Sequence, residues 1–352
     1  MTGVPQTRDA AQTEQQRRPV ATIHDVARAA GVTIGTASQA LNGRGKMRTE
    51  TRERIRDVAL RLEYRPNALM TSLLRGRSLT AGLISTDSYG RFSIPLLEGI
   101  EDVLGSAGMS AFLCDARDDP ARERRHIDAL LARQVDGIIV TGRRIDVRAP
   151  INVGAAPVPV LYAFAQVPDP TALCLLPDDT QGGYIATERL LHAGRRHLAH
   201  ITGPRHFEAV RLRRLGMERA LEDHGLRLAE GRVYSGPWQE AWGYEAVTRL
   251  LASDPRVDAI FCGADLIARG AVDALRERGV RVPDDIAVVG FDNWEIIAAG
   301  TRPALTTIDM NLHELGRLAG VKLLAMIEGE RESGVVRLPC RLVVRASCGT
   351  RT

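Results

Sequence analysis

From residue 80 onward, short apolar runs alternate with amphipathic segments. The runs TAGLIST (80–86) and VDGIIVTG (135–142) are typical of strands, as is SAFLCDA (110–116) between them. The intervening segments LLEGIEDVLGSAG (96–108) and ARERRHIDALLARQ (121–134) have helical periodicity. Alternation of this kind predicts a parallel sheet with helices on both faces.

A second series of the same kind follows. Its expected strands are LAHITGP, GRVYSG, VDAIFCGAD and IAVVGFD, and its expected helices are residues 212–225, 239–253 and 266–279. Two series of similar length predict an α/β core of two lobes. A ligand would then bind in the crevice at the carboxyl ends of the strands.

Residues 22–63 have a different pattern, which fits three short helices. Thr22 can cap the first helix, and Gly31 can end it because glycine adopts the left-handed conformation of a tight turn. Thr33 can cap the second helix, in which Ala37 and Leu41 face inward. A helix, a tight glycine turn and a second helix form a helix-turn-helix, whose second helix enters a DNA major groove.

The third expected helix completes this small domain. Thr49 is its expected cap, and Ile55, Val58, Ala59 and Leu62 form its apolar face.

The charge of the chain is unevenly distributed. Residues 1–78 hold 14 basic and 7 acidic residues, whereas residues 79–352 hold 33 basic and 36 acidic residues. This asymmetry indicates that the N-terminal part contacts a polyanion. A merely solvated basic tail is the alternative.

Several classes of protein are disfavoured. The chain contains no run of about 18 apolar residues, so no membrane span is predicted. The first 20 residues lack the apolar block of a secretory signal and are predicted to be a disordered tail. The five cysteines (Cys114, Cys174, Cys262, Cys340 and Cys348) never have C-x-x-C spacing, so reduced thiols in a cytoplasm are expected. The eight histidines form no metal spacing.

Catalysis is also not expected. The chain has no G-x-S-x-G, no P-loop and no G-x-G-x-x-G after a strand. The carboxylate pairs Asp178–Asp179 and Asp284–Asp285 lie beside turns, where helix capping and solvation account for them. We therefore predict no catalytic residue, no metal ligand and no cofactor.

Three separated runs resemble a known family. ATIHDVARAAGVTIGTASQALNG, YRPNALMTSLLRG and VPDDIAVVGFDN followed by RPALTTI are similar to the lactose-repressor/galactose-repressor family of bacterial transcriptional regulators. The resemblance implies an all-α helix-turn-helix domain, a hinge helix and a two-lobed core like that of periplasmic binding proteins. It also implies a homodimer that binds a pseudo-palindromic DNA operator, with a small-molecule effector in the core.

The resemblance sets domain boundaries. Residues 1–20 form the tail, 21–66 the helix-turn-helix domain, 67–78 the hinge helix and 79–352 the core. Lobe one is expected to comprise residues 79–178 and 309–338, and lobe two residues 179–308 and 339–352. We expect a dimer without a tetramerising coiled coil, because no leucine heptads follow the core.

The resemblance also assigns DNA contacts. Ile34, Gly35 and Gln39 match base-reading positions, with packing as the alternative for Ile34. Glutamine, where relatives commonly have arginine, favours adenine over guanine, and Gly35 cannot read a base. Leu73 matches the hinge leucine that wedges into the minor groove, with a core leucine as the alternative. Thr33, Thr36, Ser38 and Asn42 match positions that tend to touch phosphates, with ordinary solvent exposure as the alternative for Thr36, Ser38 and Asn42. Thr22 is a further expected DNA-binding residue.

Four positions match effector contacts of the family. Arg211 would grip hydroxyls or a carboxylate, Asp292 would accept hydrogen bonds, and Trp238 and Phe92 would contact a ligand face. The alternatives are a structural ion pair, a helix cap and core aromatics. Asp265 is expected to cap a helix instead.

Three further positions bear on the ligand class. Phe164 and Phe207 match positions that are polar in some sugar-binding members, and Ala264 stands where relatives often have asparagine. We therefore expect an effector with a larger apolar face than a simple hexose.

A free-standing solute-binding protein is disfavoured, because it would need an export signal and no helix-turn-helix. A cytoplasmic small-molecule-binding protein with only non-specific DNA affinity remains the alternative. The sequence specifies neither the effector, nor the operator, nor whether the effector induces or co-represses.

Overall fold

The computed structural model describes residues 21–41, 45–64, 77–87, 90–254 and 256–349. The chain divides into two compact units, of which the first ends at Ser78 and the second begins at Leu79. Several predictions fall outside the described residues: the tail, most of the hinge helix, Asn42 and Leu73.

The first unit contains three helices: α1 (Ile23–Ala29), α2 (Ile34–Leu41) and α3 (Thr49–Arg61). Thr22 caps α1 through a capping box with Asp25, as the sequence predicts. Gly31 follows at a φ of 63°, the left-handed conformation expected of the turn. The Thr33 hydroxyl accepts a hydrogen bond from the Thr36 backbone N–H (3.1 Å), so α2 is also capped as predicted.

The three helices share one small apolar core, which includes Val26, Ala37, Ala40 and Ile55. Leu41 packs against this core as predicted, although Ala40 is more deeply buried. Two details of the prediction were wrong. Arg48, not Thr49, occupies the N-cap of α3, and it makes no side-chain cap. Leu62 follows the last helical residue and is 37% exposed.

Lobe one of the second unit has a parallel sheet in the order β11-β5-β4-β3-β1-β2 among the described residues. Its strands are β1 (Thr80–Ser85), β2 (Ser110–Asp115), β3 (Gly137–Thr141), β4 (Val160–Ala163), β5 (Leu173–Pro177) and β11 (Gly334–Leu338). Its helices are α5 (Ser93–Ser106), α6 (Pro120–Ala132) and α12 (Leu312–Ile327). The two-lobed α/β fold class is confirmed.

Lobe two has a sheet in the order β12-β10-β9-β8-β6-β7, also among the described residues. All neighbours are parallel except β12, which runs antiparallel to β10 at the edge. The strands are β6 (Leu198–Thr202), β7 (Val233–Ser235), β8 (Ala259–Cys262), β9 (Ala287–Phe291), β10 (Thr306–Asp309) and β12 (Arg341–Val343). The helices are α7 (Asp179–His192), α8 (Glu208–Asp223), α9 (Glu240–Ser253), α10 (Asp265–Glu277) and α11 (Glu295–Ala298), with 3₁₀ turns at Glu230–Arg232 and Ala346–Cys348.

The lobe-two sheet is buried on both faces. In β8, Ala259 and Phe261 pack into the cluster that contains α7 and α8 residues, whereas Ile260 and Cys262 pack into the cluster that contains α9 and α10 residues. Because successive residues pack on opposite faces and both faces are buried, the strands are continuous apolar runs in the sequence. On one face, α7 and α8 pack closely at glycines: a Cβ at Gly216 would overlap the Thr180 carbonyl oxygen.

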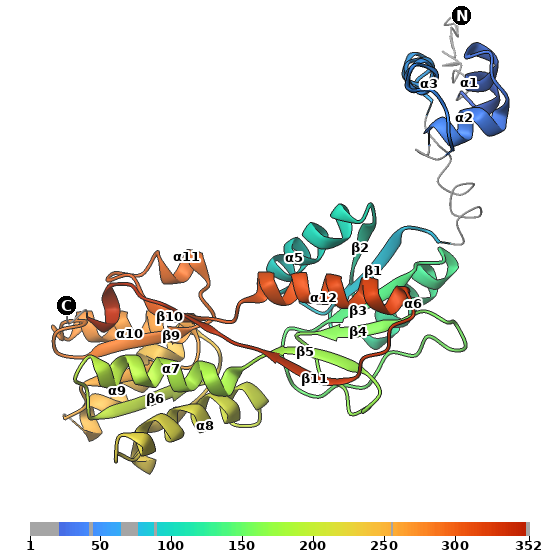
Figure 1. Ribbon diagram of the computed structural model, residues 1–352. Helices are drawn as coiled ribbons and strands as arrows, with labels where there is room; N and C mark the ends of the chain where they lie inside the picture. The colour runs from blue at the N-terminus through green and yellow to red at the C-terminus, as the bar shows by residue number, and fades with distance from the viewer. Residues whose placement is uncertain (1–20, 42–44, 65–76, 88–89, 255, 350–352) are drawn as a thin grey trace, which may run out of the picture. The chain divides into compact units, whose positions relative to one another are not determined.

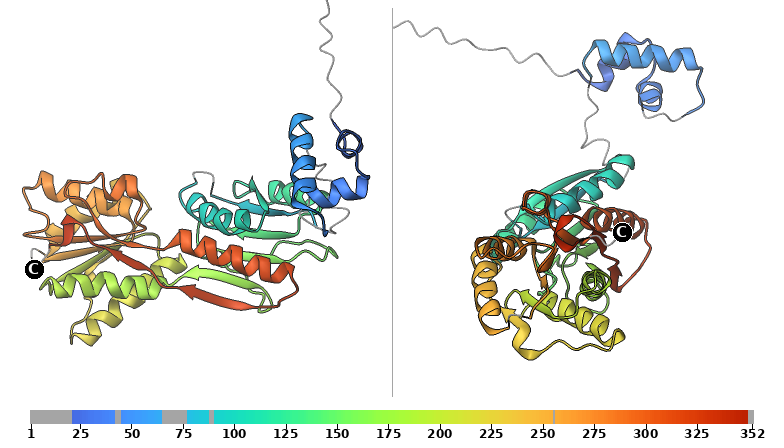
Figure 2. Two further views of the ribbon diagram at one scale, coloured as in Figure 1. Left: turned by 45° about the horizontal axis from the view of Figure 1, so that its top comes forward. Right: turned by 90° about the vertical axis from the view of Figure 1, so that its left-hand side faces the viewer.

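The chain passes between the lobes three times, from β5 to α7, from β10 to α12 and from β11 to β12. Figure 1 shows these connections in yellow-green and red, and Figure 2 shows them from two further directions. Each lobe is therefore assembled from segments that lie far apart in the sequence.

Candidate functional site

The predicted effector residues other than Arg211 lie where strands end or just before helices begin. Phe92 lies between β1 and α5, Phe164 follows β4, and Phe207 directly precedes α8. Trp238 lies between β7 and α9, and Asp292 follows β9. Loops at these ends of parallel strands commonly form ligand sites in α/β folds.

In lobe one, two aromatic rings lie together. The centroids of Phe92 and Phe164 are 5.0 Å apart. The buried Asp87 carboxylate accepts hydrogen bonds from the backbone N–H groups of Phe92 (2.7 Å) and Ser93 (3.1 Å). Asp87 thereby provides acceptors for backbone N–H groups at the start of α5 that have no partner within the helix, and it holds Phe92 in place.

In lobe two, Phe207 and Trp238 form a second aromatic pair with centroids 6.2 Å apart. The Arg144 guanidinium of lobe one lies over the Phe207 ring (5.3 Å). Nearby, the Asp146 carboxylate of lobe one accepts a hydrogen bond from the Glu208 backbone N–H at the start of α8 (2.9 Å). These contacts join the two lobes directly.

The prediction that Arg211 binds the effector does not fit the structure. Its side chain is 60% exposed and pairs with Glu208 three residues earlier on the same helix (2.6 Å). Arg213, two residues later, instead points into the protein with a 6% exposed side chain. Two residues correspond to about 200° around a helix, so Arg211 and Arg213 point in nearly opposite directions.

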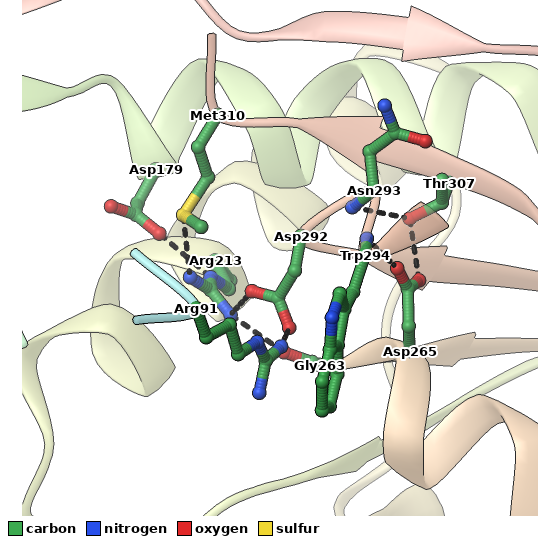
Figure 3. A network of polar contacts seen from close by, with 10 residues as sticks. All are labelled: Arg91, Asp179, Arg213, Gly263, Asp265, Asp292, Asn293, Trp294, Thr307 and Met310. Atoms are coloured by element: carbon green, nitrogen blue, oxygen red, sulfur yellow. Dashed lines mark hydrogen bonds and ion pairs between the residues drawn. The ribbon is translucent and has the colours of Figure 1, made fainter. Parts of the chain in front are cut away.

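Arg213 is the centre of a buried polar network (Figure 3). Its Nε donates to the Asp179 carboxylate (2.7 Å), its Nη1 donates to the Gly263 carbonyl oxygen (2.6 Å), and its guanidinium lies 3.6 Å from the Phe291 ring centroid. Burial raises the pKa of Asp179, and the Arg213 charge opposes that shift. Asp179 was expected only to cap or be solvated; Asp178 is the residue that caps α7.

Asp292 lies next to Arg213, with an Nη1–Oδ1 distance of 3.9 Å, and accepts a hydrogen bond from Arg91 of lobe one. Figure 3 shows the Arg91 guanidinium between the Asp292 carboxylate and the Trp294 indole. Asp292 (φ 109°) and Asn293 (φ 49°) have positive φ values that non-glycine residues seldom adopt, and such backbone clusters at ligand sites. Burial raises the pKa of Asp292, and Arg91 opposes that shift.

Asp265 is not a helix cap, contrary to the prediction. It is the first residue of α10, whose N-cap is Ala264. Its carboxylate instead accepts hydrogen bonds from the Trp294 backbone N–H (2.8 Å) and the Thr307 hydroxyl (2.6 Å). Burial, reinforced by the nearby Asp292 charge, raises its pKa to about 7. Asp265 thus holds the turn that carries Asp292 and Trp294 (Figure 3).

In the first unit, α2 presents a polar face. Thr33, Gly35 and Gln39 are exposed, and Ile34 is 43% exposed, which disfavours the packing alternative for that residue. Thr36 and Ser38 are half-buried beside the buried Ala37. The residues expected to read bases are therefore on one accessible side of a short helix.

The comparisons with known proteins agree with both parts of the structure. The family model described as "Bacterial regulatory proteins, lacI family" matches residues 22–67. A "Periplasmic binding protein-like domain" model matches residues 187–348. Catabolite control protein A of Priestia megaterium is 31% identical over 337 residues, covering 93% of this chain and 98% of that protein. The chain belongs to the lacI family of bacterial regulatory proteins.

A further relative and two solved structures are also similar to this lacI-family chain. HTH-type transcriptional repressor PurR of Pasteurella multocida (strain Pm70) is 31% identical over 339 residues, covering 94% of this chain and 100% of that protein. The lac repressor dimer bound to operator and the anti-inducer ONPF has a TM-score of 0.75 at 25% identity, covering 94% and 99%. A complex of the transcriptional regulator CelR with cellobiose has a TM-score of 0.65 at 29% identity, covering 93% and 99%. This lacI-family chain is a DNA-binding transcriptional regulator.

Other features of this lacI-family chain are negative findings. Among the residues that the structure describes, no group of three or more histidine, cysteine or acidic side chains could hold a metal ion. No helix in the described ranges is both long and apolar enough to cross a membrane. All five cysteines have free thiols.

Proposed function

We propose that this chain is a ligand-responsive repressor that acts in the cytoplasm and binds a pseudo-palindromic operator as a homodimer. The observation that carries the proposal is the exposed face of α2, where Ile34 and Gln39 are accessible near Thr33, whose hydroxyl caps the helix. An amide side chain at the surface of a recognition helix can pair with adenine N6 and N7. Thr22, Thr33, Thr36 and Ser38 support this by offering short polar groups to phosphates.

The test is a selection of bound duplexes from a random library, with full-length protein at two salt concentrations. The expected result is a palindrome with a central pyrimidine–purine step, which a hinge leucine at position 73 would wedge open. Gln39→Ala should relax the preference at one base per half-site and cost about 1–3 kcal/mol of binding. Gln239→Ala, at an exposed glutamine in the second unit, is the matched control and should leave binding unchanged.

A sequence-blind result would reverse this proposal. If only salt-sensitive binding without an enriched motif is found, the basic first unit is a non-specific patch. The chain would then be a small-molecule-binding protein with non-specific DNA affinity, as the alternative interpretation states.

We further propose that the effector binds between the lobes at Asp292, with Phe92, Phe164, Phe207 and Trp238 around it. The two aromatic pairs beside the Asp292 carboxylate favour a ligand with a larger apolar face than a simple hexose. A thermal-shift panel of monosaccharides and nucleosides tests this. A large response to a plain monosaccharide would contradict the proposed ligand class.

The dimer proposal is supported by edge strand β2. Phe112 (50% exposed) and Leu113 (47% exposed) lie on this strand, and exposed apolar side chains on a sheet edge favour association. Sedimentation equilibrium of the full chain should give a dimer, and Phe112→Glu should shift it toward monomer. If Phe112→Glu is still a dimer, the dimer interface does not include the exposed face of β2.

A further inference from the structure

One ion pair joins the lobes inside the proposed effector site. Arg91 belongs to lobe one, just before α5, and Asp292 belongs to lobe two, just after β9. Their side chains are only 16% and 6% exposed. The Arg91 guanidinium also lies 4.8 Å from the Phe92 centroid and 4.6 Å from the Trp294 centroid. It is held by a carboxylate and two aromatic rings, as a bound cation would be.

The other buried carboxylates of the network are engaged within lobe two. Asp179 pairs with Arg213, and both oxygens of Asp265 accept hydrogen bonds from Trp294 and Thr307. The Arg213 guanidinium is 3.9 Å from Asp292, with its closer contacts made to Asp179 and Gly263. Asp292 is thus the carboxylate of this network that accepts a hydrogen bond from the other lobe (Figure 3).

We propose that Arg91 is a tethered occupant of the effector site, which holds the two lobes together until an effector displaces it from Asp292. The name "effector site" rests on the proposed function, but the tethering contact does not. A ligand hydroxyl would have to compete with a charge-assisted hydrogen bond and two stacking contacts. Arg91 would thereby lower the apparent affinity of the site for weak, purely hydroxylated ligands.

The second contact between the lobes limits the effect of removing Arg91. Asp146 still accepts a hydrogen bond from the start of α8, and Arg144 still lies over Phe207. Loss of Arg91 should therefore loosen the lobes on the Asp292 side without separating them completely. The segment that follows Asp292, including α11 (Glu295–Ala298), should respond most.

The test compares full-length wild type with Arg91→Ala by hydrogen exchange and tryptophan emission. Arg91→Ala should exchange faster in α11 and change the emission, since Trp294 loses its stacked cation. Millimolar methylguanidinium chloride should reverse both changes saturably in Arg91→Ala, with an apparent affinity at least about tenfold higher than for wild type. Sodium chloride at the same concentration should not.

Two further variants make the result specific. Arg249→Ala removes an arginine that lies over Trp242 (5.7 Å) within lobe two, and it should leave α11 exchange unchanged. Asp292→Asn should loosen α11 as Arg91→Ala does, but methylguanidinium should not rescue it. The proposal is overturned if Arg91→Ala exchanges like wild type, or if methylguanidinium acts equally on Asp292→Asn. Neither DNA nor effector is used, so a failure of the proposed regulatory function would not alter these results.

Discussion

Replacing Arg213 by methionine should destabilise the core strongly, because it leaves Asp179 buried without its cation. The Asp179 side chain is 0% exposed, and its Oδ1 accepts from Arg213 Nε at 2.7 Å. Removing one partner of a buried ion pair costs about 3–5 kcal/mol. Methionine keeps the apolar stem but loses the donors to Asp179 and to the Gly263 carbonyl oxygen. We therefore expect Arg213→Met to lower the free energy of unfolding by about 3–5 kcal/mol.

Two comparisons separate this cause from general disturbance of α8. The double variant Arg213→Met with Asp179→Asn should recover about 2 kcal/mol or more, because no unpaired charge then remains buried. Arg211→Met, on the same helix, removes only an exposed pair with Glu208 and should cost less than about 1 kcal/mol.

The assay is urea unfolding of the full chain followed by circular dichroism, with each variant compared to wild type. Two results would contradict this prediction. One is that Arg211→Met costs as much stability as Arg213→Met, and the other is that Asp179→Asn makes Arg213→Met still less stable. In either case the buried charge would not be the source of the instability.

Further predictions concern pH, packing and DNA. Burial lowers the pKa of His200 from 6.5 to about 4. Between these two pH values the folded state binds fewer protons than the unfolded state, so the free energy of unfolding decreases as the pH falls from 6.5 to 4. Relative to His200→Asn, wild type should lose about 3 kcal/mol between pH 6.5 and 4 in urea titrations, and parallel pH curves would contradict this. Gly216→Ala should destabilise by about 1–3 kcal/mol because its Cβ overlaps the Thr180 carbonyl, whereas Gly105→Ala, which meets nothing within 4 Å, should raise the thermal midpoint. Gln39→Arg should shift the selected base from adenine toward guanine, and an unchanged motif would remove Gln39 from base reading.

Local signals in the sequence were enough to place the small domain and the two lobes. Thr22 and Thr33 cap their helices, and Gly31 takes its left-handed turn, because each of these effects depends on a few neighbouring residues. The alternation of strands and helices likewise predicted the lobes, although the reversed direction of β12 carried no sequence signal.

The candidate site was only partly predictable. The resemblance predicted Asp292 and the aromatic residues as effector contacts. It also predicted Arg211, which is exposed on α8, whereas Arg213 joins the buried network, because two positions along a helix change the side that a side chain faces. Arg91 and Asp292 are 201 residues apart, and nothing in either neighbourhood signals the other. Asp179 looks like an ordinary residue of a helix start until Arg213 is packed against it.

The three connections between the lobes have a consequence for synthesis on the ribosome. The lobe-one sheet lacks β11 until residue 338 has been made, and the lobe-two sheet lacks β12 until residue 343. Neither sheet can be completed as a separate cotranslational step, because both receive their last strand from the same late stretch of chain. The helix-turn-helix segment emerges long before. During synthesis the helix-turn-helix segment is therefore exposed well before the sheet of either lobe can be completed.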